Sequence, residues 1–411
     1  MRRVASVLPS ATESLCLIGG ADLLVGRSHE DNFPPEITHL PILTGQKTTF
    51  TTAKEVDAQV SAAMAAGQSL YTLDVEKIKE LRPDVILTQD ICQVCAIDLQ
   101  TVERVAASLN PPPEVVSLNP ESVQDVLAGL LQIGDAVGMR AQAEAAHASL
   151  SRRVDCIDEA VRSHLAKGFK RPSVAFIEWP DPIYVGGHWT PQLIYRAGGR
   201  HPLNEGPGDD KGANGAGKSF AVHAESVVET QPDIVIVCPC GLDLPSTRRE
   251  AARLQAMPWW ADLPAVKSGR VYLVDGDAMF NRPGPRLIEA LEWLASILLE
   301  KPQFAPVGFP FEVLTPKAAD CGPPEVKAAE EAAAAKSAAL IEIEEIHRKA
   351  VRKGEKTYID PSTGYTVFTQ LAMLERGKCC GSGCRHCPYD HQKVKPHRKA
   401  GLARPIVCEM E

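Results

Sequence analysis

The sequence predicts an α/β fold of two Rossmann-like lobes joined by a long rigid helix, followed by a small cysteine-rich module. The main observation is a repeated unit, because residues 74–90 and residues 223–241 follow one pattern. Each has a Glu near the start of a short helix, a Pro-Asp pair seven and eight residues later, and then an apolar run. A unit repeated at long spacing indicates two similar lobes, and strands that alternate with helices are typical of parallel sheets.

The first lobe is predicted over residues 1–120. An apolar run at residues 4–8 predicts a buried strand, and the helix that follows ends at Gly19-Gly20. Residues 23–26 predict a second strand, residues 53–70 an Ala-rich helix, and the repeat unit and a strand at residues 115–118 complete the lobe.

A linking backbone helix is predicted over residues 121–170, with a weak point near residues 134–138. The second lobe, residues 171–302, restarts the alternation, and its segment 190–199 parallels residues 12–20 of the first lobe. Residues 303–355 predict an Ala/Glu-rich linker that is helical at least in part. Residues 356–411 predict the cysteine-rich module.

Composition and charge favour a soluble globular protein. The chain has 411 residues, 44% of them apolar, and a net charge of −8. No run approaches the roughly 20 apolar residues of a membrane span. The apolar run at residues 4–8 is too short for the core of a secretion signal, so we expect the chain to stay in the cytoplasm. Twelve cysteines in such a reducing compartment predict thiols or metal ligands rather than disulfides.

Several segments carry a family resemblance: residues 3–13, residues 19–26, both Glu and Pro-Asp units, and the run Phe280-Asn-Arg-Pro-Gly-Pro-Arg286. Together they resemble the substrate-binding proteins of iron-siderophore and vitamin B12 ABC importers, over about residues 1–300. Residues 88–96 look like a cobalamin-binding subgroup, and residues 358–389 resemble a small cysteine-rich domain of unknown function. The resemblance implies a class III substrate-binding fold, with the ligand between the lobes and little closure on binding.

The resemblance also implies a docking role for two glutamates. Glu76 and Glu225 match the family positions that contact arginines of the membrane permease. A second interpretation is that each Glu is simply favoured near a helix N-terminus by the macrodipole.

Both repeat strands are followed by cysteines, because Cys92 and Cys95 follow the first and Cys238 and Cys240 the second. In open parallel sheets, ligands lie beyond the carboxyl ends of strands. We therefore expect four thiols near one cleft, where thiolates suit zinc, copper(I), an iron–sulfur cluster or the cobalt of a corrinoid. Inert packing and redox pairing are the alternatives.

Further ligand candidates follow from position: His29, Trp179, His188, Trp189, Asp277 and Phe280. Trp and His offer a flat apolar face and a metal-directed nitrogen, which suit a large planar ligand. The family's vitamin B12 binder has a Trp immediately before the position of Phe280, where this chain has Met279, so the ligand identity stays open.

The tail carries the densest pattern of metal-ligand residue types: Cys379, Cys380, Cys384, Cys387 and His386. It predicts a zinc site or, alternatively, an iron–sulfur cluster. Adjacent cysteines rarely bind one ion together, so His386, His391 or a partner would complete the shell. The basic residues at 393–399 predict a surface for a protein partner, and the lack of interleaved aromatic residues disfavours nucleic acid.

The favoured function is an intracellular, non-catalytic binding protein for a corrinoid such as cobalamin, or another metal chelate, with a metal-binding tail. No Ser/His/Asp set or catalytic carboxylate pair stands out. The alternatives are an enzyme that processes such a ligand with cleft thiols, and a substrate-binding component of an ABC importer.

Overall fold

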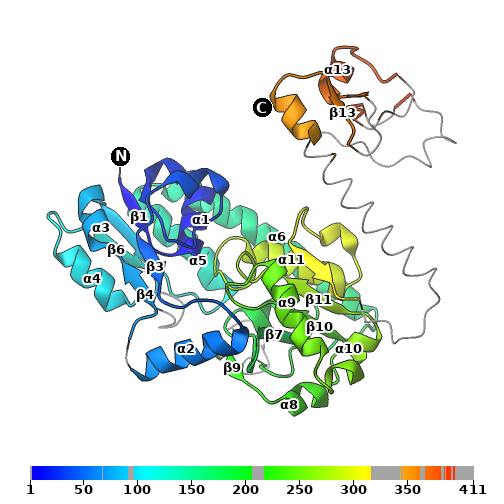
Figure 1. Cartoon of the computed structure of the whole chain (residues 1–411), viewed down its shortest axis with the longest axis horizontal. Coiled ribbons are helices and arrows are strands. Elements are labelled where there is room, and N and C mark those ends of the chain that lie inside the picture. The colour runs from blue at the N-terminus through cyan, green and yellow to red at the C-terminus, as the bar shows by residue number, and fades with distance from the viewer. Residues whose placement is uncertain are drawn as a thin grey trace. The chain divides into compact units, whose positions relative to one another are not determined.

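The computed structural model describes residues 2–315 apart from 67, 91–96 and 206–216, and, in the C-terminal part, residues 343, 346–361, 366–380, 384, 386–389 and 392–393. The chain divides into two compact units, Met1–Pro316 and Lys317–Glu411. The first unit contains two large sheets with helices packed around them, as Figure 1 shows, and one two-stranded sheet. No helix among the described residues has the length and apolarity needed to span a membrane.

The N-terminal lobe is built on a four-stranded sheet in the order β2-β1-β5-β6, with all neighbouring strands parallel. Val4, Val85 and Leu87 of this sheet belong to a core that also includes residues of α1 and α5. The strands are β1 (Val4–Ser6), β2 (Leu24–Gly26), β5 (Val85–Thr88) and β6 (Glu114–Ser117), and the helices include α1 (Pro9–Leu17), α3 (Val75–Leu81) and α4 (Leu99–Ala107).

The C-terminal lobe has a six-stranded mixed sheet in the order β12-β11-β10-β7-β8-β9. Its centre is parallel, as predicted, whereas β8, β9 and β12 are antiparallel to their neighbours. The strands are β7 (Val174–Pro180), β8 (Ile183–Val185), β9 (Phe220–Ala221), β10 (Ile234–Val237), β11 (Val271–Val274) and β12 (Phe311–Val313). Because β12 pairs with β11, this lobe extends past the boundary predicted at residue 302.

Helices cover both faces of the second sheet, and the short helix α8 (Ala224–Glu229) lies at the start of the repeat unit of this lobe. The helices are α7 (Thr190–Arg196), α8, α9 (Leu244–Gln255), α10 (Pro264–Lys267) and α11 (Leu287–Leu298). Trp293 of α11 is fully buried and stacks on Phe309, with 4.9 Å between ring centroids.

The repeated Pro-Asp unit ends a helix and binds the start of a neighbouring strand in both lobes. The residue before each Pro adopts a left-handed conformation, with φ 47° at Arg82 and φ 42° at Gln231, and so ends the helix. The Asp carboxylate then accepts a hydrogen bond from the backbone N–H at the start of the neighbouring strand. Asp84 accepts from Arg3 at 2.7 Å, and Asp233 accepts from Ser173 at 2.7 Å.

Two helices link the lobes. The long helix predicted between them is present as α6 (Arg140–Ala166), and α5 (Val123–Val137) precedes it. The break falls at Gly138, whose φ of 74° requires glycine and terminates α5. At Gly134 the two helices approach closely, because an added Cβ would lie 2.4 Å from the Cβ of Ala143.

One segment of the N-terminal lobe contacts the C-terminal lobe. The antiparallel pair β3 (Thr44–Gln46) and β4 (Tyr71–Leu73) brackets α2 (Ala53–Ala65). Figure 1 shows α2 lying beside β7, and the indole Nε1 of Trp179 in β7 donates to the carbonyl of Ala53 at 3.1 Å. Helix α2 therefore connects the two lobes.

The second unit contains a helical segment at residues 346–352, an antiparallel pair β13 (Thr357–Ile359) and β14 (Thr366–Phe368), and α13 (Gln370–Leu374). A small apolar core forms beneath the paired strands from Ile343, Ala350 and Tyr358.

Candidate ligand site between the lobes

Two arginines of the C-terminal lobe tie the lobes together at Glu13. Arg286 donates from Nε and Nη2 to the two carboxylate oxygens of Glu13, at 2.9 and 2.7 Å. Arg282 Nη1 lies 3.3 Å from the same carboxylate. The Glu13 side chain is 2% exposed and the Arg282 side chain 8%, so this is a buried charge cluster. Removing either sign would leave the other charge buried without its full compensation.

Arg282 also organises the loop that carries His29. Its guanidinium donates to the Asn32 side chain and to the backbone carbonyl of Glu30, both at 2.9 Å. It donates to Asp277 at 2.9 Å as well, and Asn32 Nδ2 donates to the other oxygen of Asp277 at 2.7 Å. The predicted ligand residue Asp277 therefore lies at the lobe junction, with its carboxylate held by both lobes.

The Pro-Gly-Pro run after Arg282 lets the backbone of the C-terminal lobe lie close to α1 of the N-terminal lobe. A Cβ added to Gly284 would lie 3.2 Å from the Cα and Cβ of Ser10, tighter than ordinary van der Waals contact. The run carries part of the family resemblance, but the sequence alone gives its arginines no partner. The missing information was the distance between Glu13 and Arg286 in space, which sequence spacing does not reveal.

His29 lies just after β2 with one ring nitrogen fixed. Its Nδ1 is 2.7 Å from Thr44 Oγ1, which also accepts from the His29 backbone N–H at 3.0 Å. Because the Thr44 hydroxyl donates its own proton to Ser28, we assign the proton between His29 and Thr44 to Nδ1. The Nε2 atom then carries a lone pair, is buried and has no hydrogen-bond partner among the residues that the structure describes. Burial lowers the pKa of His29 below its ordinary value, which favours the neutral ring.

Two carboxyl groups beside His29 were not selected from the sequence. Burial, opposed by Arg282, raises the pKa of Glu30 to about 7. Burial also raises the pKa of Asp31 to about 6, although the Thr12 hydroxyl donates to its carboxylate at 2.6 Å. Their only sequence signal is adjacency to His29.

On the C-terminal side, Trp179 is half-buried and holds α2 through its indole N–H. His188 is also half-buried, adopts a left-handed φ of 51° and stacks on Trp189 with 5.5 Å between ring centroids. Burial lowers the pKa of His188, while Glu121 opposes that shift. Trp179 and His188 thus present partly exposed aromatic surface.

Three predicted ligand residues lie in the core instead. Phe280 is 1% exposed and packs against Phe176 and Trp293. Trp189 is buried, and its Nε1 donates to the backbone carbonyl of Phe280 at 2.6 Å. Cys238 is fully buried, and burial raises the pKa of its thiol well above the ordinary value. We therefore leave these three out of the proposed ligand set.

The remaining cleft thiols are only partly located. Cys240 is exposed, so it and Cys238 face different environments. Cys92 and Cys95 lie outside the described residues. The prediction that the two thiol pairs approach each other therefore stays a prediction.

The two predicted docking glutamates occupy equivalent exposed positions. Glu76 is in the first turn of α3 and Glu225 in the first turn of α8. Glu76 is 83% exposed and pairs with Lys79 at 2.8 Å, a contact worth at most about 1 kcal/mol in such a setting.

In the second unit, the four tail thiols gather as two pairs. Cys380 and Cys384 have their sulfurs 3.2 Å apart, and Cys379 and Cys387 have theirs 3.9 Å apart. His386 is buried, stacks on His347 at 3.6 Å between ring centroids, and bonds to the Tyr358 hydroxyl through Nε2 at 2.8 Å. Burial and the contact with Cys380 raise the pKa of Cys384 to about 11.

The predicted zinc or iron–sulfur site receives no support from this arrangement. Within the described part of the chain, no group of three or more His, Cys, Asp or Glu side chains is placed to hold a metal ion. His391 and most of the basic stretch at residues 393–399 lie outside the described residues.

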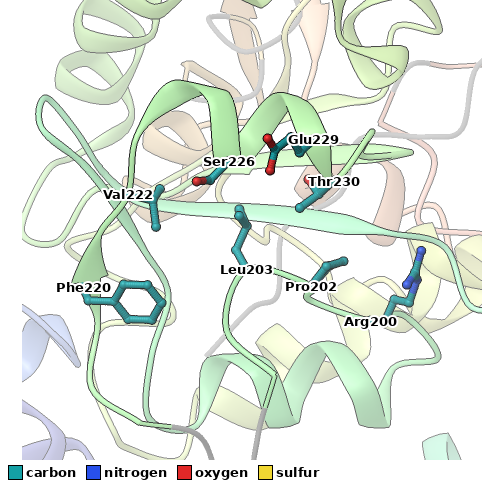
Figure 2. Close-up of a pocket in the computed structure, with 8 residues that line it drawn as sticks. All are labelled: Arg200, Pro202, Leu203, Phe220, Val222, Ser226, Glu229 and Thr230. Carbon is teal, nitrogen blue, oxygen red and sulfur yellow. The ribbon is translucent and has the colours of Figure 1, made fainter.

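A separate hollow of about 520 Å³ lies within the C-terminal lobe, away from the residues predicted from the sequence. Figure 2 shows Ser226, Glu229 and Thr230 above Pro202 and Leu203. The hollow is open, and its charged lining residues are Arg200 and Glu229.

Comparison with known proteins identifies the first unit. Residues 4–278 match the family described as periplasmic binding protein. The chain belongs to this family. Residues 346–393 match a second family, DUF5522, which is described as of unknown function. An uncharacterised ABC transporter substrate-binding lipoprotein of Bacillus subtilis, YvrC, is 25% identical over 299 residues, 72% of this chain and 79% of its own length.

Solved structures confirm the fold. A periplasmic heme-binding protein of Pseudomonas aeruginosa superposes with a TM-score of 0.55 at 20% identity, covering 73% of this chain and 93% of its own. The periplasmic vitamin B12 binding protein of Vibrio cholerae gives a TM-score of 0.52 at 18% identity, covering 73% and 98%. The predicted two-lobed class III fold is therefore confirmed. These relatives are solute-binding proteins, which confirms the expectation that the protein is not an enzyme.

The predicted cytoplasmic location is wrong. The family is periplasmic and the Bacillus relative is a lipoprotein, so the related proteins function outside the cytoplasm. The prediction took the short apolar run at the start of the chain as evidence against export. That run forms the buried strand β1, which the sheet requires and which carries no information about location.

Proposed function

We propose that this protein is the substrate-binding component of an ABC importer and that its cargo is a corrinoid or a related metal chelate held between the lobes. Membership of the periplasmic binding protein family supports the first part. The single structural observation that supports the second is the state of His29 at the lobe junction.

His29 has the properties of a metal ligand. Metal-bound histidines bind through a neutral ring whose other nitrogen donates to a fixed partner, which sets the tautomer and the orientation. Thr44 supplies that partner at 2.7 Å, and burial keeps the ring neutral. Within the described part of the chain Nε2 is left without a hydrogen-bond partner, an arrangement that a bond to a metal would satisfy.

The charges around His29 favour a corrinoid over haem. The periphery of a corrinoid carries amides, which seek acceptors, whereas haem carries propionates, which seek cations. Glu30 and Asp277 supply carboxyl groups at the junction, and the two arginines there are already bound to Glu13 and Asp277. A propionate would therefore meet carboxylates and arginines that are already paired.

Titration of the purified protein with aquocobalamin tests this proposal, with hemin in parallel. We expect a change in the cobalamin absorption spectrum as a ring nitrogen replaces the cobalt-bound water. His29→Ala is expected to weaken binding by at least about tenfold. The matched control is His39→Ala, which removes an exposed histidine of η2 (Pro35–His39).

The outcomes separate the alternatives. Tight binding of hemin without binding of cobalamin would overturn the corrinoid assignment and leave the importer role intact. Cobalamin binding that is unchanged in His29→Ala would overturn the role of His29. Binding of neither ligand would remove both chelates from the proposal.

A further inference from the structure

The described cysteines of the tail differ sharply in exposure although two of them are adjacent in sequence. Cys379 and Cys387 are 5% and 4% exposed, whereas Cys380 is exposed and Cys384 is partly exposed. All four are thiols in this structure. Because neighbouring side chains Cys379 and Cys380 face different environments, the four sulfurs make an inner pair and an outer pair.

We propose that the outer pair, Cys380 and Cys384, is a redox-active dithiol that is oxidised to a disulfide by a low-molecular-weight disulfide such as oxidised glutathione. The two sulfurs are 3.2 Å apart, and an S–S bond is about 2.05 Å long. The two sulfurs therefore need to approach each other by roughly 1 Å for the bond to form.

Exposure assigns the order of the two steps. Cys380 is the more exposed sulfur, so it attacks one sulfur of the small disulfide, forms a mixed disulfide and releases one small thiol, which takes the proton that Cys380 loses. Cys384 then attacks the Cys380 sulfur, and the second small thiol leaves with the Cys384 proton. Two protein thiols are oxidised, and one disulfide is reduced to two thiols.

The inner pair, Cys379 and Cys387, is buried and packed within the module instead. Cys379 accepts a hydrogen bond from the Lys393 backbone N–H at 3.4 Å, and its sulfur lies 3.9 Å from Cys387. Cys387 follows His386, which is packed on His347 and bonded to Tyr358. Attack on a small disulfide in solution requires access that these buried sulfurs lack.

Redox titration of the full-length protein tests the proposal. The reduced protein is equilibrated with glutathione buffers without oxygen, quenched in acid, alkylated and digested with trypsin. Cleavage after Lys378 and Arg385 places Cys379, Cys380 and Cys384 in one peptide and Cys387 in the next. We expect the first peptide to lose two hydrogens and to carry one alkyl group, with the two peptides unlinked.

Variants locate the bond. Cys384→Ser is expected to stop at a glutathione adduct on Cys380, and Cys380→Ser to lose the reaction. Cys156→Ser, which removes an exposed cysteine of α6, is the matched control and leaves the oxidation unchanged. Loss of the disulfide in Cys379→Ser, linked peptides that contain Cys387, or a persistent adduct in the natural chain would each overturn the proposal. So would a tightly bound metal ion that protects all four thiols until a chelator removes it.

Discussion

The two lobes share the same helix ends and strand starts and differ where they meet. Gly20 N–H donates to the Leu15 carbonyl at 2.9 Å, and Gly199 N–H donates to the Ile194 carbonyl at 2.9 Å, so α1 and α7 end in the same way. Asp84 and Asp233 secure the neighbouring strand in the same way. The repeat therefore encodes the scaffold of each lobe.

At the junction the contributions are complementary rather than equivalent. The N-terminal lobe supplies the acids Glu13 and Glu30 together with His29, and the C-terminal lobe supplies the arginines 282 and 286. Opposite charges from unlike positions fix how the lobes sit against each other. A repeat thus identifies the fold, and departures from the repeat mark the junction where we propose that a ligand binds.

Loss of the buried ion pairs at the lobe junction should lower the free energy of unfolding more than any other change considered below. Glu13→Ala leaves Arg282 and Arg286 without their buried partner, and we expect the free energy of unfolding to fall by about 3–5 kcal/mol. Urea denaturation followed by circular dichroism measures the change. The control is Glu80→Ala, which removes an exposed ion pair with Lys77 and is expected to leave the free energy of unfolding nearly unchanged. Equal losses of stability in both variants would contradict a buried ion-pair cluster at Glu13.

The pH dependence of stability tests the role of Glu30 at the lobe junction. Since the pKa of Glu30 is raised from 4.5 to about 7, the folded state keeps a proton that the unfolded state releases in this window. The free energy of unfolding contributed by Glu30 therefore falls as pH rises from about 4.5 to 7. Glu30→Gln should gain about 1–3 kcal/mol over the natural chain at pH 8, after allowance for partial exposure, and little at pH 4.

Denaturation curves at pH 4, 6 and 8 check this difference, with Glu36→Gln as an exposed control on η2. Asp31 titrates near the same range in both proteins, so only the difference between them is informative. A difference that does not change with pH would show that Glu30 is ionised at little cost.

Sequence reasoning reached the scaffold because the scaffold depends on local chemistry. The helix end before Pro83 and Pro232, the glycine stops and the apolar strands are all set by neighbours in sequence. It missed Glu30 and the partners of Arg282, because those depend on residues about 250 positions apart meeting in space. Phe280 shows the opposite error. Its position in the chain suggested ligand contact, but its ring packs in an aromatic cluster.

Equivalent positions of the scaffold should respond equally. Asp84→Ala and Asp233→Ala each remove one carboxylate acceptor from the start of a strand, and we expect each to cost about 1–2 kcal/mol. Both side chains are exposed, so water partly replaces the lost bond. Urea denaturation of the two variants checks the equality, and a difference above about 1 kcal/mol would show that the repeat is structurally similar but energetically unequal.

The smallest effect on stability is expected at the docking positions. Glu76→Gln and Glu225→Gln change exposed side chains, so the free energy of unfolding should move by less than about 0.5 kcal/mol, and ligand affinity should be unchanged. If the two lobes present these carboxylates to a permease, each variant should weaken stimulation of permease ATPase activity in liposomes, and the double variant more so. Glu55→Gln in the first turn of α2 is the matched control, because it changes another exposed carboxylate near a helix N-terminus. Stimulation that survives the double variant would reduce Glu76 and Glu225 to helix-start residues favoured by the macrodipole.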